Sequence, residues 1–82
     1  MVVDCTLSGN SSGGNGGGIA NRSGGTVQVT GSTLSGNSAG ADGGAIYNLA
    51  TLSVGSSTFS GNSPDAIANF GTYNDLGGNT FN

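Results

Sequence analysis

Basic side chains are almost absent from this sequence of 82 residues, which has one Lys or Arg (Arg22), no histidine and a net charge of −3. Proteins that bind nucleic acid neutralise phosphates with several Lys or Arg side chains, so this shortage excludes nucleic acid as a partner. It also excludes binding to a membrane surface through a basic amphipathic helix.

Long apolar runs and cysteine pairs are missing as well. No apolar stretch approaches the length of a membrane span or of a signal-peptide core. We therefore expect no membrane insertion by this segment, and an export signal outside it. The single cysteine, Cys5, has no second cysteine with which to form an internal disulfide.

Glycine is abundant, with 18 copies among many Ser, Thr and Asn residues. This composition is typical of flexible linkers, but a linker has no need for apolar residues at fixed places. Here a phrase recurs as TLSGNS at 6–11, TLSGNS at 33–38 and TFSGNS at 58–63, and TFN at 80–82 begins a further copy. The sequence is therefore a repeat array.

Two other phrases recur with the first one. A phrase around isoleucine follows it, as GGIAN at 17–21, GAIYN at 44–48 and DAIAN at 65–69. An apolar position precedes it at Val2, Val29, Val54 and Leu76, which gives repeats of 27, 25 and 22 residues. The predicted coils are approximately 2–28, 29–53 and 54–75, with a partial coil at 76–82.

Each fixed phrase is short and β-like, and the segments of variable length between the phrases are rich in turn-forming residues. Frequent glycine and the lack of a 3.6-residue apolar period argue against helices. The sequence therefore predicts an all-β right-handed parallel β-helix, a three-sheet solenoid of about three and a half coils.

Alternation along the strands predicts which side chains point into the solenoid. The inward set begins with the valine column, which is Val2, Val29, Val54 and Leu76. It also includes Leu7, Leu34, Phe59 and Phe81, the glycines Gly9, Gly36 and Gly61 beside them, and Ile19, Ile46 and Ile67. The outward set is Thr6, Thr33, Thr58, Thr80, Ser8, Ser35 and Ser60, and the variable positions Ala20, Tyr47 and Ala68. Two asparagine columns at strand ends predict amide ladders: Asn10, Asn37 and Asn62, and Asn21, Asn48 and Asn69.

Cys5 aligns with Ser32 and Ser57 in the later repeats. With no basic residue nearby in sequence to lower its pKa, it is interpreted as a small structural residue.

Two tetrapeptides resemble a known family. Phe59-Ser60-Gly61-Asn62 fits an FxxN motif, Gly43-Gly44-Ala45-Ile46 reads GGAI, and Gly16–Ile19 is a near match. These alternating motifs resemble the polymorphic outer membrane proteins of chlamydiae and related bacterial surface proteins with pectate-lyase-like β-helices. Pro64-Asp65 departs from the glycine pair in the third copy.

The resemblance implies a non-catalytic structural or adhesive segment of an extracellular or outer-membrane, cell-surface protein, like an autotransporter passenger. The partner it implies is a protein or glycan of a host or neighbouring cell.

An enzyme is the main alternative, because many β-helices degrade polysaccharides. Hydrolysis needs a pair of clustered carboxylates, whereas Asp4, Asp42, Asp65 and Asp75 occupy four different places in the repeat. Only Asp42 and Asp65 could meet, if their loops stack. We therefore expect no catalytic, cofactor-binding or metal-binding residue here. One version of this alternative is left open: the chain is a fragment of a pectate-lyase-like enzyme whose active site lies outside this segment.

The glycine runs fit neither a phosphate loop nor the calcium-binding nonapeptide, which needs an Asp in every turn. The outward Thr-x-Ser array leaves ice binding as a minor alternative.

Because solenoids need several repeats and polar caps, we also expect marginal stability in isolation and end-to-end self-association through open strand edges.

Overall fold

The computed structural model describes residues 2–81, which form thirteen strands and no helix. The strands are β1 (Val2–Val3), β2 (Thr6–Ser8), β3 (Ser11–Ser12), β4 (Ile19–Asn21), β5 (Thr26–Thr30), β6 (Thr33–Ser35), β7 (Ser38–Ala39), β8 (Ile46–Asn48), β9 (Thr51–Gly55), β10 (Thr58–Ser60), β11 (Ile67–Asn69), β12 (Thr72–Gly77) and β13 (Thr80–Phe81). Within this part of the chain no helix is long and apolar enough to cross a membrane.

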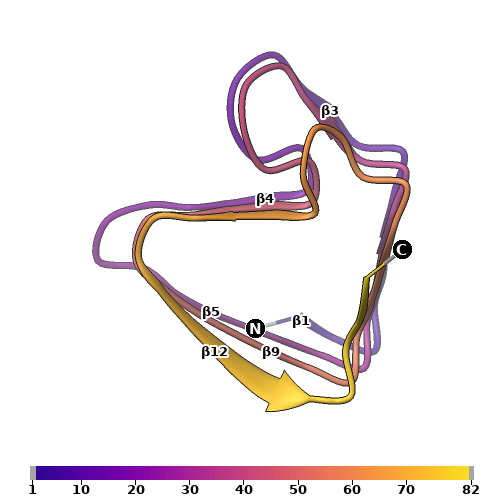
Figure 1. The fold of residues 1–82 in the computed structure, drawn as a ribbon, viewed down its shortest axis with the longest axis vertical. Helices are drawn as coiled ribbons and strands as arrows, with labels where there is room; N and C mark the ends of the chain where they lie inside the picture. The colour runs from indigo at the N-terminus through magenta and orange to yellow at the C-terminus, as the bar shows by residue number, and fades with distance from the viewer. Residues whose placement is uncertain (1, 82) are drawn as a thin grey trace.

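All strand pairs are parallel, and each strand pairs with its counterpart one coil away. The three main sheets have the orders β1-β5-β9-β12, β2-β6-β10-β13 and β4-β8-β11. They form the three sides of a triangular coil (Figure 1). A short fourth sheet, β3-β7, lies at one corner, and the sequence pattern did not predict it because its Ser-rich strands resemble turns.

The coil is right-handed. Seen from the C-terminal end, the chain runs anticlockwise around the triangle while it advances toward the viewer (Figure 1). The shortest dimension of the molecule is 17 Å, which matches about three and a half coils at roughly 4.8 Å per strand spacing. The predicted fold class is confirmed.

The interior consists of stacked apolar columns. Leu7, Leu34, Phe59 and Phe81 pair in register, and so do Ile19, Ile46 and Ile67. The rings of Phe59 and Phe81 stack with centroids 4.9 Å apart and planes within 8° of parallel. A further column, Val27, Leu52 and Tyr73, fills the coil from the first sheet; the sequence analysis missed it because its three side chains differ in type.

The valine column ends differently from the prediction. Val2, Val29 and Val54 do stack, but the residue that pairs with Val54 is Asp75, and Gly77 pairs with Gly55. A β-bulge between Asp75 and Gly77 leaves Leu76 outside the column, with 55% of its surface exposed. The assignment of Leu76 to the core was wrong, because a bulge changes the side to which later residues point.

The prediction that the glycines of the first phrase point inward was also wrong. Gly9, Gly36 and Gly61 lie just after their strands, are exposed and have φ values of 67°, 61° and 62°. This left-handed conformation is readily adopted by glycine and turns the chain at the corner of the triangle. The glycines therefore set the corner geometry, while the interior is filled by the neighbouring Leu and Phe side chains.

Most of the difference in length between the second and third coils is absorbed in one corner loop. Ser38 forms a bridge with Ser63, and Gly44 N donates to the Asp65 carbonyl. Five residues (39–43) thus separate the paired positions in the second coil, where Pro64 alone separates them in the third. The flanking strands stay in register, so the loop varies in length without disturbing the core.

Candidate functional site

The asparagine columns form the predicted ladders. Asn37 is fully buried; its amide accepts from Asn10 Nδ2 at 3.1 Å and donates to Asn62 Oδ1 at 3.0 Å. Its Nδ2 also donates to the Leu7 carbonyl at 3.0 Å. The side-chain amides at this corner are therefore hydrogen-bonded to neighbouring coils, which gives these asparagines a structural role.

The second ladder has the same polarity. Asn21 donates to Asn48, and Asn48 donates to Asn69, each at 2.8 Å. In this ladder the Nδ2 groups of Asn21 and Asn48 therefore donate toward the C-terminal end of the solenoid. At that end, the Nδ2 group of Asn69 has no acceptor within residues 2–81.

The third corner carries a hydrogen-bond chain that the sequence analysis did not predict. The backbone N–H of Cys5 donates to Ser32 Oγ, that of Ser32 to Ser57 Oγ, and that of Ser57 to Asn79 Oδ1. Cys5 itself donates its thiol to the Val3 carbonyl. The alignment of Cys5 with two serines was the available signal, and a structural role of this position fits these contacts.

The four aspartates occupy four different positions of the repeat. Asp75 accepts hydrogen bonds from Gly77 N and Asn79 Nδ2, each at 2.8 Å. Asp42 lies in the long loop of the second coil, whereas Asp65 follows the short loop of the third, beside Gly44. Among the described residues no three His, Cys, Asp or Glu side chains gather where they could hold a metal ion.

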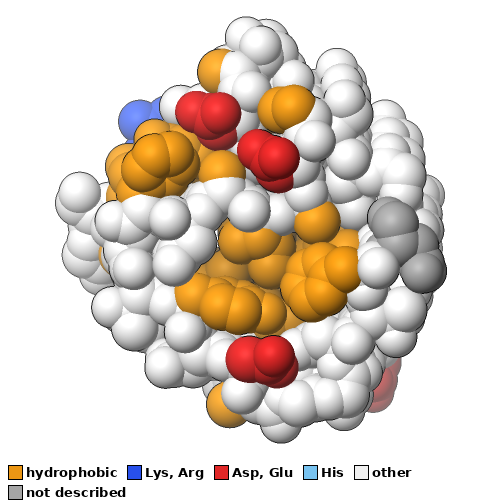
Figure 2. Space-filling model, viewed as in Figure 1, with side chains coloured by type: hydrophobic (Ala, Val, Ile, Leu, Met, Phe, Trp, Pro, Cys, Tyr) orange, Lys and Arg blue, Asp and Glu red, His pale blue; other side chains and the backbone are white. Residues whose placement is uncertain are grey.

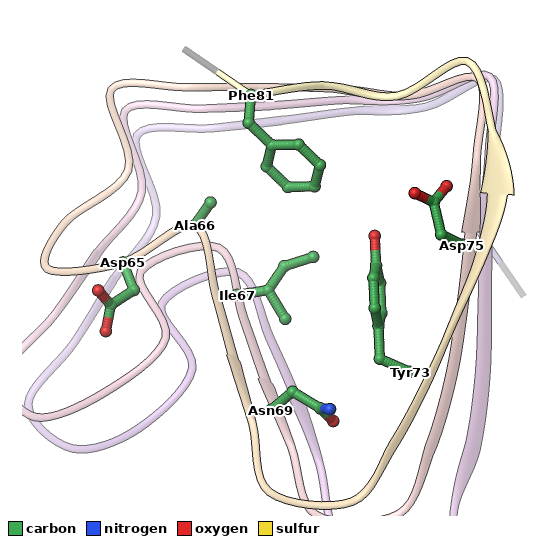
Figure 3. Close-up of a pocket in the computed structure, with 7 residues that line it drawn as sticks. All are labelled: Asp65, Ala66, Ile67, Asn69, Tyr73, Asp75 and Phe81. Atoms are coloured by element: carbon green, nitrogen blue, oxygen red, sulfur yellow. The ribbon is translucent and has the colours of Figure 1, made fainter.

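The C-terminal end face of the solenoid exposes part of its interior. Figure 2 shows this face as an apolar hollow with acidic groups at its border. The hollow has a volume of about 420 Å³ and is lined by Asp65, Ala66, Ile67, Asn69, Tyr73, Asp75 and Phe81. Ile67, Tyr73 and Phe81 point into it from three different sides, and Asp65 and Asp75 lie on opposite sides (Figure 3). We call this surface the end face.

Tyr73 places a hydroxyl group inside the end face. Its hydroxyl is buried and has no hydrogen-bond partner within residues 2–81. Burial raises the pKa of the Tyr73 hydroxyl above its ordinary value of 10.0, and the negative charge of Asp75 raises it further. The hydroxyl therefore stays protonated at neutral pH and is a free donor at the solenoid end.

The outer face of the sheet β2-β6-β10-β13 is a regular hydroxyl array. Thr6, Thr33, Thr58 and Thr80 pair in register, as do Ser8, Ser35 and Ser60. All of these residues are partly or fully exposed, as predicted. On the neighbouring sheet β4-β8-β11, the prediction that the variable positions are exposed holds only in part. Ala20 is exposed, whereas Ala68 is buried with 8% of its surface exposed.

These features define a right-handed parallel β-helix repeat array, with stacked apolar columns inside and hydrogen-bond ladders at its corners. Residues 4–22 and 31–49 match the sequence model of the Chlamydia polymorphic membrane protein repeat. These two segments are therefore similar to the Chlamydia polymorphic membrane protein repeat. The matches cover β2 to β4 and β6 to β8, so they fall on the same positions of two successive coils. No match was found among curated proteins or among solved structures.

Proposed function

We propose that this chain is a non-catalytic structural segment of an extracellular or outer-membrane, cell-surface bacterial protein. The observation that carries the proposal is the use of its polar side chains: the corner amides and hydroxyls bond to the next coil rather than converge on a cavity. The similarity to a membrane-protein repeat family supports a place on the cell surface.

We further propose an adhesive role, in which the outer faces of the solenoid contact a protein or glycan of a host or neighbouring cell. Support comes from the exposed groups that the outer faces present: hydroxyls in register on one sheet, and Tyr47 and Phe70 on another. A solenoid repeats such groups at each coil, which suits extended contact with a partner.

Surface labelling tests the location. Antibody raised against the refolded 82-residue segment should stain intact cells that express the whole protein, and protease added outside should remove the signal. Staining that appears only after the cells are opened would overturn the surface location.

Bead binding tests the adhesive role separately. Beads coated with the segment should attach to cells more than beads coated with the same segment after unfolding and alkylation. Equal attachment of the two preparations would overturn adhesion and leave the structural role intact.

Catalysis is tested with acidic polysaccharides. Because the four aspartates lie at separate places, the segment should release neither reducing ends nor unsaturated products from such polymers. Release of either product that tracks with the purified segment would contradict the non-catalytic assignment and favour a polysaccharide-degrading enzyme.

Ice binding is a second candidate, and the in-register Thr-x-Ser array on β2-β6-β10-β13 favours it. Such a face could order water at regular positions. A thermal hysteresis measurement on the refolded segment decides this: a gap between melting and freezing points supports the candidate, and its absence removes it.

A further inference from the structure

A niche lies on the outer face of the sheet β4-β8-β11, on the side away from the core. The loop between β3 and β4 projects at this corner (Figure 1). The niche has a volume of about 280 Å³ and is lined by Gly14, Asn15, Ala20, Arg22, Tyr47 and Leu49. It thus brings together the chain's sole basic side chain, an amide and an aromatic ring.

The niche results from a difference in side-chain size along one outward column. Ala20 pairs with Tyr47, which in turn pairs with Ala68. Because Ala20 is small, space remains beside Tyr47 on the side of the first coil. On its other side the Tyr47 ring contacts Phe70, with ring centroids 5.5 Å apart and planes tilted by 46°. Tyr47 is therefore held as a wall of the niche.

The polar groups of the niche are mainly hydrogen-bond donors. Asn15 Oδ1 already accepts from the backbone N–H of Asp42 at 3.1 Å, which fixes the amide and leaves its Nδ2 group to donate outward. Arg22 is exposed, and within residues 2–81 its guanidinium has no hydrogen-bonded acceptor. A guanidinium matches a carboxylate in a two-bond geometry. The niche thus suits a ligand that is rich in acceptors and carries a carboxylate.

The apolar lining selects a second property of the ligand. The Tyr47 ring and the methyl group of Ala20 offer an apolar surface beside the donors, and such mixed surfaces suit ligands with one apolar face. A hexuronate ring combines these properties, because it has an apolar C–H face, several hydroxyls and a carboxylate. Sites for drug-sized ligands begin at about 300 Å³, so this niche has room for a single sugar residue.

We propose that this niche binds a carboxylated sugar residue of a glycan, with Tyr47 against the ring and Arg22 on the carboxylate. The proposal rests on the adhesive role and names its ligand class. The net charge of −3 does not prevent binding, because at physiological salt charges beyond about 8 Å are largely screened. A single niche of this kind gives a dissociation constant on the order of 1 mM, and repetition along a surface raises the avidity.

Two sugars that differ only in the carboxylate test the proposal. Methyl β-glucuronide and methyl β-glucoside are titrated into the isotope-labelled 82-residue chain, and the backbone amide signals are followed by NMR. The glucuronide should shift the amides of Asn15, Arg22 and Tyr47, and the glucoside should bind at least about tenfold more weakly. Equal binding of the two sugars, or no shift at these amides up to about 50 mM glucuronide, would overturn it.

Variants then separate the niche from general surface effects. Arg22→Gln should reduce glucuronide affinity at least about tenfold while glucoside binding stays unchanged. Tyr47→Leu, which keeps apolar bulk without a flat ring, should weaken both sugars. Asn74→Ala, at an exposed position of another sheet, is the matched control and should bind as the parent does. Unaltered affinity in Arg22→Gln would exclude the niche, whereas cell adhesion that persists despite this result would point to a protein partner elsewhere on the surface.

Discussion

The side-chain amide of Asn48 donates to Asn69 Oδ1 at 2.8 Å and to the Thr72 carbonyl at 2.9 Å, and so ties the second coil to the third. Asn48 is fully buried and also accepts from Asn21 Nδ2. Asn48→Ala leaves these partners without a bond, so the free energy of unfolding should fall by about 3 kcal/mol in urea denaturation.

The matched control for this ladder is Asn74→Ala. Asn74 is exposed and its side chain makes one long hydrogen bond, 3.4 Å, to Ser53 Oγ. Its removal should change the free energy of unfolding by less than about 0.5 kcal/mol. If Asn48→Ala were as mild as this control, the ladder would not be a main source of stability.

The register at the last bulge is tested by a pair of substitutions. Val54 is completely buried, so Val54→Ala should cost about 2 kcal/mol of unfolding free energy. Leu76 is mostly exposed, so Leu76→Ala should cost less than about 0.5 kcal/mol although it removes more atoms. Thermal melts of the two variants check the order, and a larger loss in Leu76→Ala would show that Leu76 belongs to the core column.

The glycine pair of the long loop is predicted to be sensitive to added atoms. A Cβ at Gly44 would lie 2.4 Å from Ser63 N and 2.5 Å from the Ser63 carbonyl oxygen, both backbone atoms of the next coil. Gly44→Ala must therefore push two coils apart and should lower the unfolding free energy by more than about 2 kcal/mol. Gly13→Ala, in open space at ordinary φ, should be nearly neutral. Similar melts for the two variants would contradict the close approach.

Tyr73 gives a prediction for stability against pH. Its pKa is raised in the folded state by burial and then by Asp75, so the folded chain holds this proton more tightly than the unfolded chain. The resulting stabilisation is complete below pH of about 10 and is lost as pH rises through the folded pKa. The melting temperature of Tyr73→Phe should therefore fall less than that of the parent as the pH rises across this alkaline range.

At neutral pH the same substitution removes a buried hydroxyl that has no partner. Tyr73→Phe should therefore be neutral or stabilising by up to about 1 kcal/mol. A clear loss of stability at pH 7, measured by urea denaturation, would mean that the hydroxyl has a hydrogen-bond partner.

The end face leads to a proposal on self-association. In a head-to-tail stack, Asn69 Nδ2 of one copy would meet Asn21 Oδ1 of another, and the apolar columns would continue in the same order. The mass measured by sedimentation should therefore rise with concentration. Phe81→Asp should suppress this rise, whereas Phe70→Asp, at another exposed aromatic residue away from the end face, should not. A sharp melt of a monomer at every concentration would contradict the proposal.

Most of the solenoid could be predicted because similar residues occupy the same position in successive coils. The Leu/Phe, Ile and asparagine columns recur at nearly fixed spacing, and all of them pair in register. Leu76 was misassigned because spacing alone cannot reveal a bulge. The column of Val27, Leu52 and Tyr73 was missed because apolar packing requires similar placement rather than similar identity.

The candidate niche could not be predicted from the sequence, for a different reason. Asn15 and Arg22 lie outside the recurring phrases of the first coil, whereas Tyr47 lies in the isoleucine phrase of the second, and only the parallel stacking brings them together. The sequence did mark position 47 as variable and outward, which was a correct but incomplete signal.

The loop at residues 39–43 has a practical consequence. The third coil has Pro64 alone in place of these five residues while the pairs on either side stay bonded, so the chain already tolerates both lengths at one place. Each doubling of a flexible loop adds only about 0.6 kcal/mol of closure cost. A foreign peptide inserted beside Pro64, where the third coil is short, should therefore be displayed at the corner while the strand pairing stays intact, which makes this solenoid a scaffold for epitope presentation.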